Sequence, residues 1–298
     1  MTRFTLRQLS YFVTAADQGT TAAAAQAHGI SQSAMSSALT DLERTLGVQL
    51  LLRNKAKGVT LTQAGREALP DARRLLIASE ELQSRITDLG NEPAGRLTIG
   101  CFTDFAAFVL PPLLRDFTHR CPRIEPDFTE GGQVVLQDQL MEGRCELALL
   151  WDIGLRPGIT THELYPLLPQ VLLPPGHRLA RREAVSARDL AAEPMILLTA
   201  APGTDFVQSV FAAAQSTPKI RFRTERFEHA RALVAHGLGY TLYAQPAGLD
   251  PATWAGDMVV RPLSDPVPPR PVVLAHPTGA RLTRRAQLFL RHCVGGDK

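Results

Sequence analysis

Apolar residues recur at the spacing of α-helices through the N-terminal quarter of the chain, and three short helices follow from this pattern. The first has apolar residues at Leu6, Leu9, Phe12, Val13 and Ala16. The second is rich in alanine, starts at Thr21 and ends before Gly29, because glycine tolerates the left-handed conformation just past a helix end. Ser31 offers an N-cap oxygen for the third helix. The apolar stripe of this third helix is Ala34, Ala38, Leu39 and Leu42.

The opposite face of the third helix carries short, neutral hydrogen-bonding side chains. These are Gln32, Ser33, Ser36, Ser37 and Thr40. Such side chains can enter a DNA major groove and contact base edges or phosphates. A helix that is apolar behind and rich in hydroxyls in front suits DNA recognition. The alternative is an ordinary helical hairpin whose polar face is only solvated.

The distribution of charge favours the DNA-binding interpretation. A basic hairpin, or wing, is predicted after the third helix, where Arg53, Lys55 and Lys57 cluster around Gly58 and could contact phosphates. Residues 1–66 hold seven basic and three acidic residues, a net charge of +4, whereas the whole chain carries only +3. The excess positive charge therefore lies in the same segment as the predicted recognition helix.

This segment resembles the LysR-type transcriptional regulators. The resemblance rests on three ordered motifs: LRQLSYFVTAADQG, AAAAQAHGISQSAMSSALTDLERTLGVQLLLR and GVTLTQAGREALPDARRLL. The chain departs from the family pattern at Thr21, His28, Ser33, Ser37 and Leu51, where an aromatic residue, leucine, proline, a basic residue and phenylalanine are usual. The resemblance implies an all-α winged helix-turn-helix domain over residues 1–62 that binds double-stranded promoter DNA. With the residue pattern, it predicts contacts by Ser31, Gln32, Ser33, Ser36, Ser37, Arg53, Lys55 and Lys57.

A long helix is predicted over residues 63–90, with Thr62 as its N-cap. Its apolar and small residues alternate in steps of four and three: Ala68, Ala72, Leu75, Ser79, Leu82, Ile86 and Leu89. This seam is typical of a helix that packs along a partner helix. Pro70 should kink or weaken its first two turns. We expect a homodimer through this linker helix and, from the family resemblance, a homotetramer; a lone amphipathic helix docked on its own domain is the alternative.

Strand and helix patterns alternate from residue 91 onward. Strands are predicted at 97–101, 124–128, 146–151, 195–199, 220–224, 240–244 and 272–276, and helices at 105–117, 134–141, 205–214, 228–236 and 284–293. Two βαβαβ units with a late returning strand predict two α/β lobes. Lobe I covers about 95–165 plus 268–298, lobe II about 166–267, and the crossovers fall near 164–168 and 265–271. This part is similar to the LysR-type effector domain, whose two-lobed form resembles periplasmic binding proteins.

Ligands bind such sheets beyond the carboxyl ends of their strands. Family members often place effector contacts there, and the positions that match are Phe102, Thr103, Glu130, Trp151, Thr199 and Ala200. The expected effector is a small carboxylate or an aromatic molecule. Thr103 or Asp104 could instead cap the next helix, and Trp151 could serve only to pack the lobes together.

Other classes of protein find little support in the chain. No catalytic, metal-binding or cofactor-binding motif is present, so we expect no enzyme activity, no metal and no cofactor. The N-terminus does not read as a secretory signal and no apolar run could span a bilayer, which predicts a cytoplasmic protein without a membrane partner. A cytosolic solute-binding protein and a redox sensor that uses Cys101 remain the alternatives. The four cysteines otherwise read as small core residues.

Overall fold

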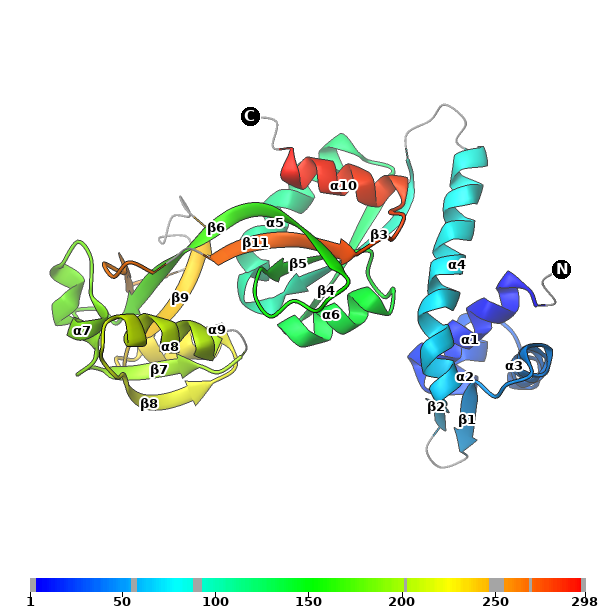
Figure 1. Cartoon of the computed structure of the whole chain (residues 1–298), viewed down its shortest axis with the longest axis horizontal. Coiled ribbons are helices and arrows are strands. Elements are labelled where there is room, and N and C mark those ends of the chain that lie inside the picture. Colours follow the sequence, from blue (N-terminus) through cyan, green and yellow to red (C-terminus); the bar gives the residue numbers. More distant parts are fainter. Residues whose placement is uncertain are drawn as a thin grey trace.

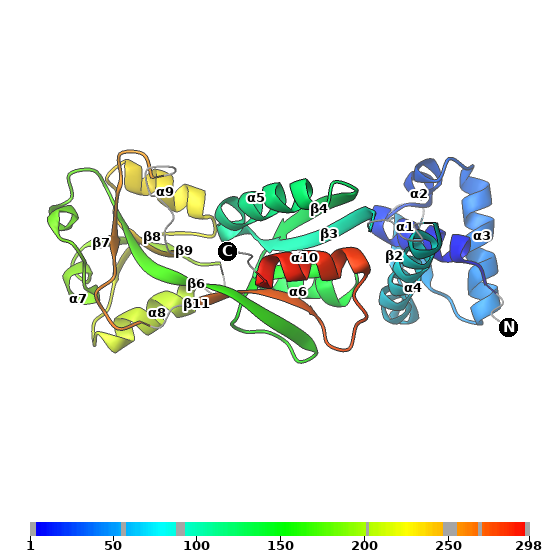
Figure 2. The ribbon, with the colours of Figure 1, turned by 90° about the horizontal axis from the view of Figure 1, so that it is seen from above.

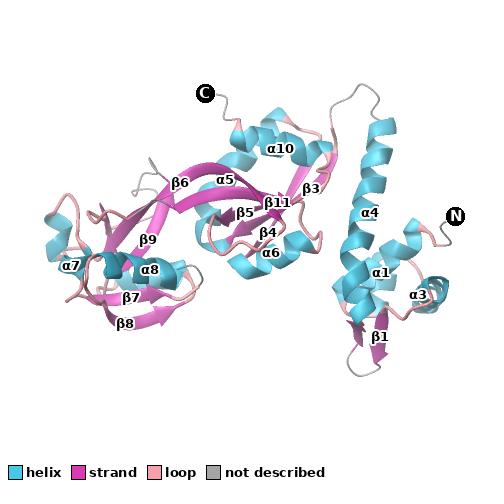
Figure 3. Cartoon of the chain, viewed as in Figure 1, coloured by secondary structure: helices cyan, strands magenta, loops and turns pink. Residues whose placement is uncertain are grey.

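The computed structural model describes residues 4–54, 58–87, 93–200, 203–246, 255–267 and 270–295. It has three parts in a row, a helical N-terminal unit and two α/β lobes (Figure 1). Figure 3 shows that the strands gather in the two lobes, apart from one small hairpin in the N-terminal unit. The predicted order of a helical N-terminal unit, a long helix and a two-lobed α/β body is confirmed.

The N-terminal unit packs short helices against a two-stranded hairpin. Its elements are α1 (Leu6–Gln18), α2 (Thr21–Ala27), α3 (Gln32–Leu46), β1 (Leu51–Asn54) and β2 (Gly58–Leu61). Hydroxyl side chains of Thr5, Thr20 and Ser31 cap the three helices. Gly29 adopts a φ of +63° at the turn before α3, as predicted.

The buried stripe of α3 differs from the predicted one. Met35, Leu39 and Leu42 are buried, whereas Ala34 is exposed. The prediction at Ala34 is therefore wrong. The physical reason is that Met35 lies one helix turn before Leu39, and its long, adaptable side chain fills the core.

The linker helix α4 (Gln63–Thr87) begins as predicted: the N–H of Gly65 donates to Thr62 Oγ1 at 2.9 Å. It is one helix through Pro70. Its first turns pack on the N-terminal core, where Leu69 and Ala72 are buried. Further along, Leu75, Leu82 and Ile86 are exposed by 49, 57 and 60 %. Leu89 lies outside the described residues.

Lobe I is built on one edge of the largest sheet. Its elements are β3 (Gly95–Phe102), α5 (Thr103–Arg120), β4 (Ile124–Gly131), α6 (Gln133–Met141), β5 (Leu147–Trp151), β11 (Arg270–Pro277) and α10 (Arg284–Val294). Strand β3 pairs in parallel with both β4 and β5, and β11 returns antiparallel to β5. The buried cluster between this sheet and its helices includes Leu97, Ile99, Leu149, Leu274 and Phe289.

A 15-residue strand, β6 (Ile159–Leu173), carries the chain from lobe I to lobe II. It pairs with β11 over 159–167 and then with β9 and β10. The first crossover is therefore a continuous strand shared by both lobes, which can be followed in Figure 2. Sequence reasoning did not predict this strand, because Pro166 and Pro169 within it read as interruptions.

Lobe II follows the predicted order of elements. Its elements are a 3-10 turn (Arg178–Arg181), α7 (Ala187–Leu190), β7 (Pro194–Leu198), α8 (Gly203–Ala213), β8 (Lys219–Thr224), α9 (Phe227–Ala235), β9 (Thr241–Pro246) and β10 (Val259–Pro262). Strands β7 and β8 form a separate parallel pair. Within the described part of the chain, no helix combines the length and apolar character that crossing a membrane requires.

Two buried arginines join the N-terminal unit and α4 to lobe I. Arg73 of α4, 5 % exposed, forms an ion pair with Asp17 of α1 and donates to the main-chain oxygen of Glu142 at 3.0 Å. Arg285 of α10, also 5 % exposed, pairs with Glu146 at 3.2 Å and approaches Glu80 of α4 at 3.8 Å. We call these contacts the polar junction.

Candidate DNA-contacting surface and interlobe cavity

The exposed face of α3 carries a set of short polar side chains close to its N-terminus. Gln32 Nε2 donates to Thr21 Oγ1 of α2 at 3.2 Å, which ties the two helices together. Ser31 Oγ accepts the N–H of Ala34 at 3.2 Å and lies 3.0 Å from Ser33 Oγ. Ser37 is exposed and Ser36 is half-buried. The five predicted positions thus lie within seven residues, at the N-cap and in the first turns of one helix.

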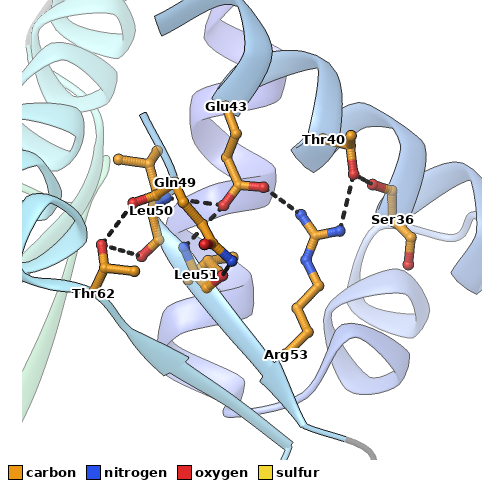
Figure 4. A network of polar contacts seen from close by, with 8 residues as sticks. All are labelled: Ser36, Thr40, Glu43, Gln49, Leu50, Leu51, Arg53 and Thr62. Carbon is orange, nitrogen blue, oxygen red and sulfur yellow. Dashed lines mark hydrogen bonds and ion pairs between the residues drawn. The ribbon is translucent and has the colours of Figure 1, made fainter. Parts of the chain in front are cut away.

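Hydrogen bonds and an ion pair centred on Glu43 connect the wing to α3 (Figure 4). One carboxylate oxygen of Glu43 accepts the N–H groups of Leu50 and Leu51, both at 2.9 Å. The other accepts from Arg53 at 2.8 Å. Arg53 also donates to Thr40 Oγ1 at 2.9 Å, and that hydroxyl donates to the main-chain oxygen of Ser36.

This network gives Arg53 a position that the sequence did not foresee. The Arg53 side chain is about 30 % exposed and is bound to α3, so it connects strand β1 to the helix. Its predicted contact with phosphate stays a prediction. Lys55 and Lys57 lie outside the described residues.

A second candidate site lies where the two lobes meet. A cavity of about 60 Å³ is lined from lobe I by Phe102, Asp104, Phe108, Trp151 and Ile153, and from lobe II by Leu198, Gly203, Phe206, Phe227, Leu242, Tyr243 and Ala244. Most of these are apolar, and five of the rings meet edge to face or at a tilt. The Phe108 and Phe227 ring centroids are 6.3 Å apart across the lobes, and Phe227 lies 5.3 Å from Tyr243.

Asp104, in the first turn of α5, is the one carboxyl group among the described residues that line the cavity. It accepts the main-chain N–H of Phe227 at the start of α9, so it links the two lobes. Burial raises the pKa of Asp104 to about 6, while the Phe227 N–H and the positive charge of Arg226 act in the opposite direction. No side chain caps α5, whose N-cap is Phe102, so capping by Thr103 or Asp104 is wrong.

The structure brings together only part of the predicted effector set. Phe102 and Trp151 line the interlobe cavity. Thr103 and Glu130 are exposed and line an adjacent groove on the outer side of α5, together with Phe128 and Arg226. We call this the outer groove.

Thr199 and Ala200 are half-buried and follow β7 directly after the cavity residue Leu198. Their main-chain groups are used locally: the Thr199 N–H donates to Thr224 at 2.9 Å, and Ala200 accepts the Gly203 N–H at 2.7 Å. The lobe II residues Phe206, Phe227 and Tyr243 were missed by sequence reasoning. Buried aromatics in a predicted helix or strand look the same whether they line a core or a cavity.

The cysteine side chains are placed for packing rather than for chemistry. Cys101 is fully buried in the lobe I core, and burial raises the pKa of its thiol far above the ordinary range. A thiol held neutral is a poor nucleophile toward oxidants, so the redox-sensor alternative is not favoured. Across the residues that the structure describes, no three His, Cys, Asp or Glu side chains are grouped to hold a metal ion.

The chain belongs to the LysR family of bacterial transcriptional regulators. Residues 6–66 match the family described as "Bacterial regulatory helix-turn-helix protein, lysR family", and residues 90–297 match the "LysR substrate binding domain". The protein is therefore a DNA-binding transcriptional regulator with an effector-binding domain, and the solute-binding alternative is not favoured.

Individual relatives agree with this assignment. The HTH-type transcriptional regulator TtuA of Agrobacterium vitis is 32 % identical over 242 residues, which cover 78 % of each chain. The crystal structure of HinK, a LysR family transcriptional regulator from Pseudomonas aeruginosa, is 35 % identical, covers 98 % of both chains and has a TM-score of 0.63. Full-length CbnR in complex with its target DNA, 24 % identical with a TM-score of 0.68 and covering 97 % of this chain and 99 % of its own, shares the fold.

Proposed function

We propose that α3 reads bases in the major groove of promoter DNA while the wing binds the neighbouring backbone. The observation that carries this proposal is the Glu43 network, which sets the wing at a defined distance from the polar face of α3. Base contacts are assigned to Gln32, Ser33 and Ser36, with Ser31 and Ser37 beside them. Phosphate contacts are assigned to Arg53, Lys55 and Lys57. Because Ser37 stands where the family usually has a basic residue, the wing supplies more of the phosphate attraction.

Base reading is tested by a substitution at Gln32. Gln32→Ala should change the preference among bases at one position by about 1–3 kcal/mol. The control is Gln63→Ala, at an exposed residue at the start of α4, which should leave the selected sequence unchanged. A binding-site selection experiment checks both variants. An unchanged profile for Gln32→Ala would remove Gln32 from base reading.

Arg53→Ala should weaken binding to all sequences alike and flatten the salt slope by about one unit. Arg53 also anchors the wing, so Glu43→Gln is the control: it weakens the anchor but keeps the positive charge of Arg53. If both variants change the salt slope equally, the effect comes from the anchor rather than from a phosphate contact.

The linker helix is proposed to form the dimer, and two dimers to form a tetramer. Its seam residues Leu75, Leu82 and Ile86 are exposed on the single chain, although their spacing fits a partner helix. Leu82→Glu would bury an unpaired charge in the seam, at a cost of several kcal/mol. Light scattering should show a smaller mass for Leu82→Glu, whereas the same charge at Gln83→Glu should leave the mass unchanged.

The effector is proposed to bind between the lobes and to favour one arrangement of them over another. Phe102 and Trp151 already line the cavity. Thr103, Glu130, Thr199 and Ala200 are adjacent to its lining residues and become contacts when a ligand moves the lobes apart. We place the domain divisions at 62/63 and 90/91, assign no catalytic role, and expect the protein to act in the cytoplasm, where its DNA is.

A further inference from the structure

The chemistry of the interlobe cavity restricts the class of effector. Its lining contains aromatic rings from both lobes and one carboxyl group, and no Lys, Arg or His is among the described lining residues. A carboxylate ligand would therefore enter an apolar site that has an acid on its wall and no cation to pair with. Burial of an unpaired charge is strongly unfavourable.

A positive side chain acts on Asp104 but does not line the cavity. Arg226 is exposed and lies in the outer groove. Asp104 itself lines both the outer groove and the cavity, so its carboxyl group stands at the boundary between them. A carboxylate has several lone pairs and the Phe227 N–H uses one of them, so Asp104 has the capacity to accept a further hydrogen bond from a ligand.

The size of the cavity is a second restriction on the effector. Its volume of about 60 Å³ is less than half of the roughly 150 Å³ that accommodates benzene in an engineered protein. A ring can enter only if the lobes separate. The aromatic side chains that a ring would displace belong to both lobes, so a flat apolar molecule can replace ring–ring contacts such as Phe108 with Phe227.

We propose that the effector of this protein is an apolar, ring-bearing molecule that carries an amine or another N–H donor and no acid group, with its donor bound by Asp104. The proposal rests on the assignment of the effector site to the interlobe cavity. It departs from the expectation of a small carboxylate and keeps the expectation of an aromatic molecule.

The test uses three probes of nearly equal size and different charge: benzylamine, benzamide and benzoate. Calorimetric titration of the full-length protein near neutral pH should give low-millimolar binding of benzylamine, with benzoate at least about tenfold weaker. Asp104→Asn keeps the shape of the side chain and its contact with the Phe227 N–H. It should lower the affinity for benzylamine about tenfold and change that for benzamide about twofold or less. Glu228→Gln, which removes an acid from the outer groove, is the matched control and should change neither.

A blocking variant separates failure of the ligand class from failure of the site. Ala244→Phe fills the cavity from β9 and should abolish binding of every probe. If benzoate binds as tightly as benzylamine and Ala244→Phe abolishes both, the site is right and the proposed class is wrong. If benzylamine is preferred but Ala244→Phe has no effect, the site is wrong. Absence of binding by both benzylamine and benzamide would also overturn the class.

Discussion

Lobe I takes part in two junctions of opposite chemistry. On one side, the polar junction joins it to α1 and α4 through Arg73 and Arg285, each paired with carboxylates. On the other side, rings such as Phe108 and Phe227 join it to lobe II. Ion pairs are directional and compete with water, whereas apolar contact is not directional and follows the area buried. The polar junction is therefore suited to holding lobe I in one orientation relative to α1 and α4. The apolar junction is suited to opening and closing around a ligand.

The comparison also shows where a signal could pass. Both junctions rest on the same sheet: β3 ends at Phe102 beside the cavity, and Glu146, just before β5, binds Arg285. Strands β3 and β5 are paired directly, so the two sides of lobe I are connected by a sheet rather than by a loop. The following predictions test the difference between the junctions, from the largest effect to the smallest.

The largest effect is expected in the apolar junction. Phe227 is 6 % exposed and contacts rings from both lobes, so Phe227→Ala should lower the free energy of unfolding by about 3–5 kcal/mol. Phe128 is 48 % exposed, and Phe128→Ala should cost about 0.5 kcal/mol or less. Urea unfolding followed by tryptophan fluorescence measures both. Equal costs would mean that the rings do not hold the lobes together.

The next prediction concerns the charge of Asp104 between the lobes. Its folded-state pKa, about 6, lies above the ordinary value of 3.8, so the folded chain binds the proton more tightly than the unfolded chain. Stability contributed by the neutral carboxyl is therefore complete below about pH 4 and is lost as the pH rises through about 6. At neutral pH, Asp104→Asn should be more stable than the natural chain by at most about 3 kcal/mol.

The pH dependence of that difference is the measurement. Thermal unfolding of both chains between about pH 4 and 7.5 should show a gap that closes toward the acidic end. Glu130, Arg226 and Glu228 share the outer groove with Asp104 and are present in both chains, so the difference between the chains reports on Asp104. A variant that is less stable than the natural chain at neutral pH would show that the charged carboxylate is favoured.

A smaller effect is expected in the polar junction. Arg73→Met keeps the length of the side chain but leaves Asp17 and Glu142 without their buried partner. Both carboxylate side chains are 41 % exposed and can regain water, so the cost should be only about 1–2 kcal/mol. Arg74→Met is the matched control: Arg74 is 54 % exposed and pairs within its own helix, and its loss should cost about 0.5 kcal/mol or less.

The smallest effect is the response of the natural chain to salt. Surface ion pairs are screened as salt rises, whereas apolar contacts are not weakened. Hydrogen exchange should therefore become faster at the end of α6, beside Glu142, when sodium chloride is raised to about 1 M. Hydrogen exchange of the amides at the start of α9, beside Phe227, should not become faster. Parallel changes at both places would contradict the distinction between the two junctions.

Local sequence predicted most of the elements, because the signals that start and stop them are local. Ser31 caps α3 and Thr62 caps α4, as their positions indicated. Gly29 adopts the left-handed conformation at the predicted turn. The alternation of strands and helices after residue 91 gave the right order of elements, with ends that differ by a few residues. Strand β6 escaped prediction because its stability comes from pairing with β9, β10 and β11, which are far away in the chain.

The candidate sites divide in the same way. The sequence by itself determined helix α3, the long helix with its four-three seam and the two-lobed plan, since each rests on periodicity and capping within one segment. Only the tertiary structure decided that Arg53 is held by Glu43, that Phe227 and Tyr243 face Phe102 and Trp151, and that Asp104 bridges the lobes. These contacts join residues from separate elements. The identity of a polar or aromatic residue does not indicate which distant residue the fold will place beside it.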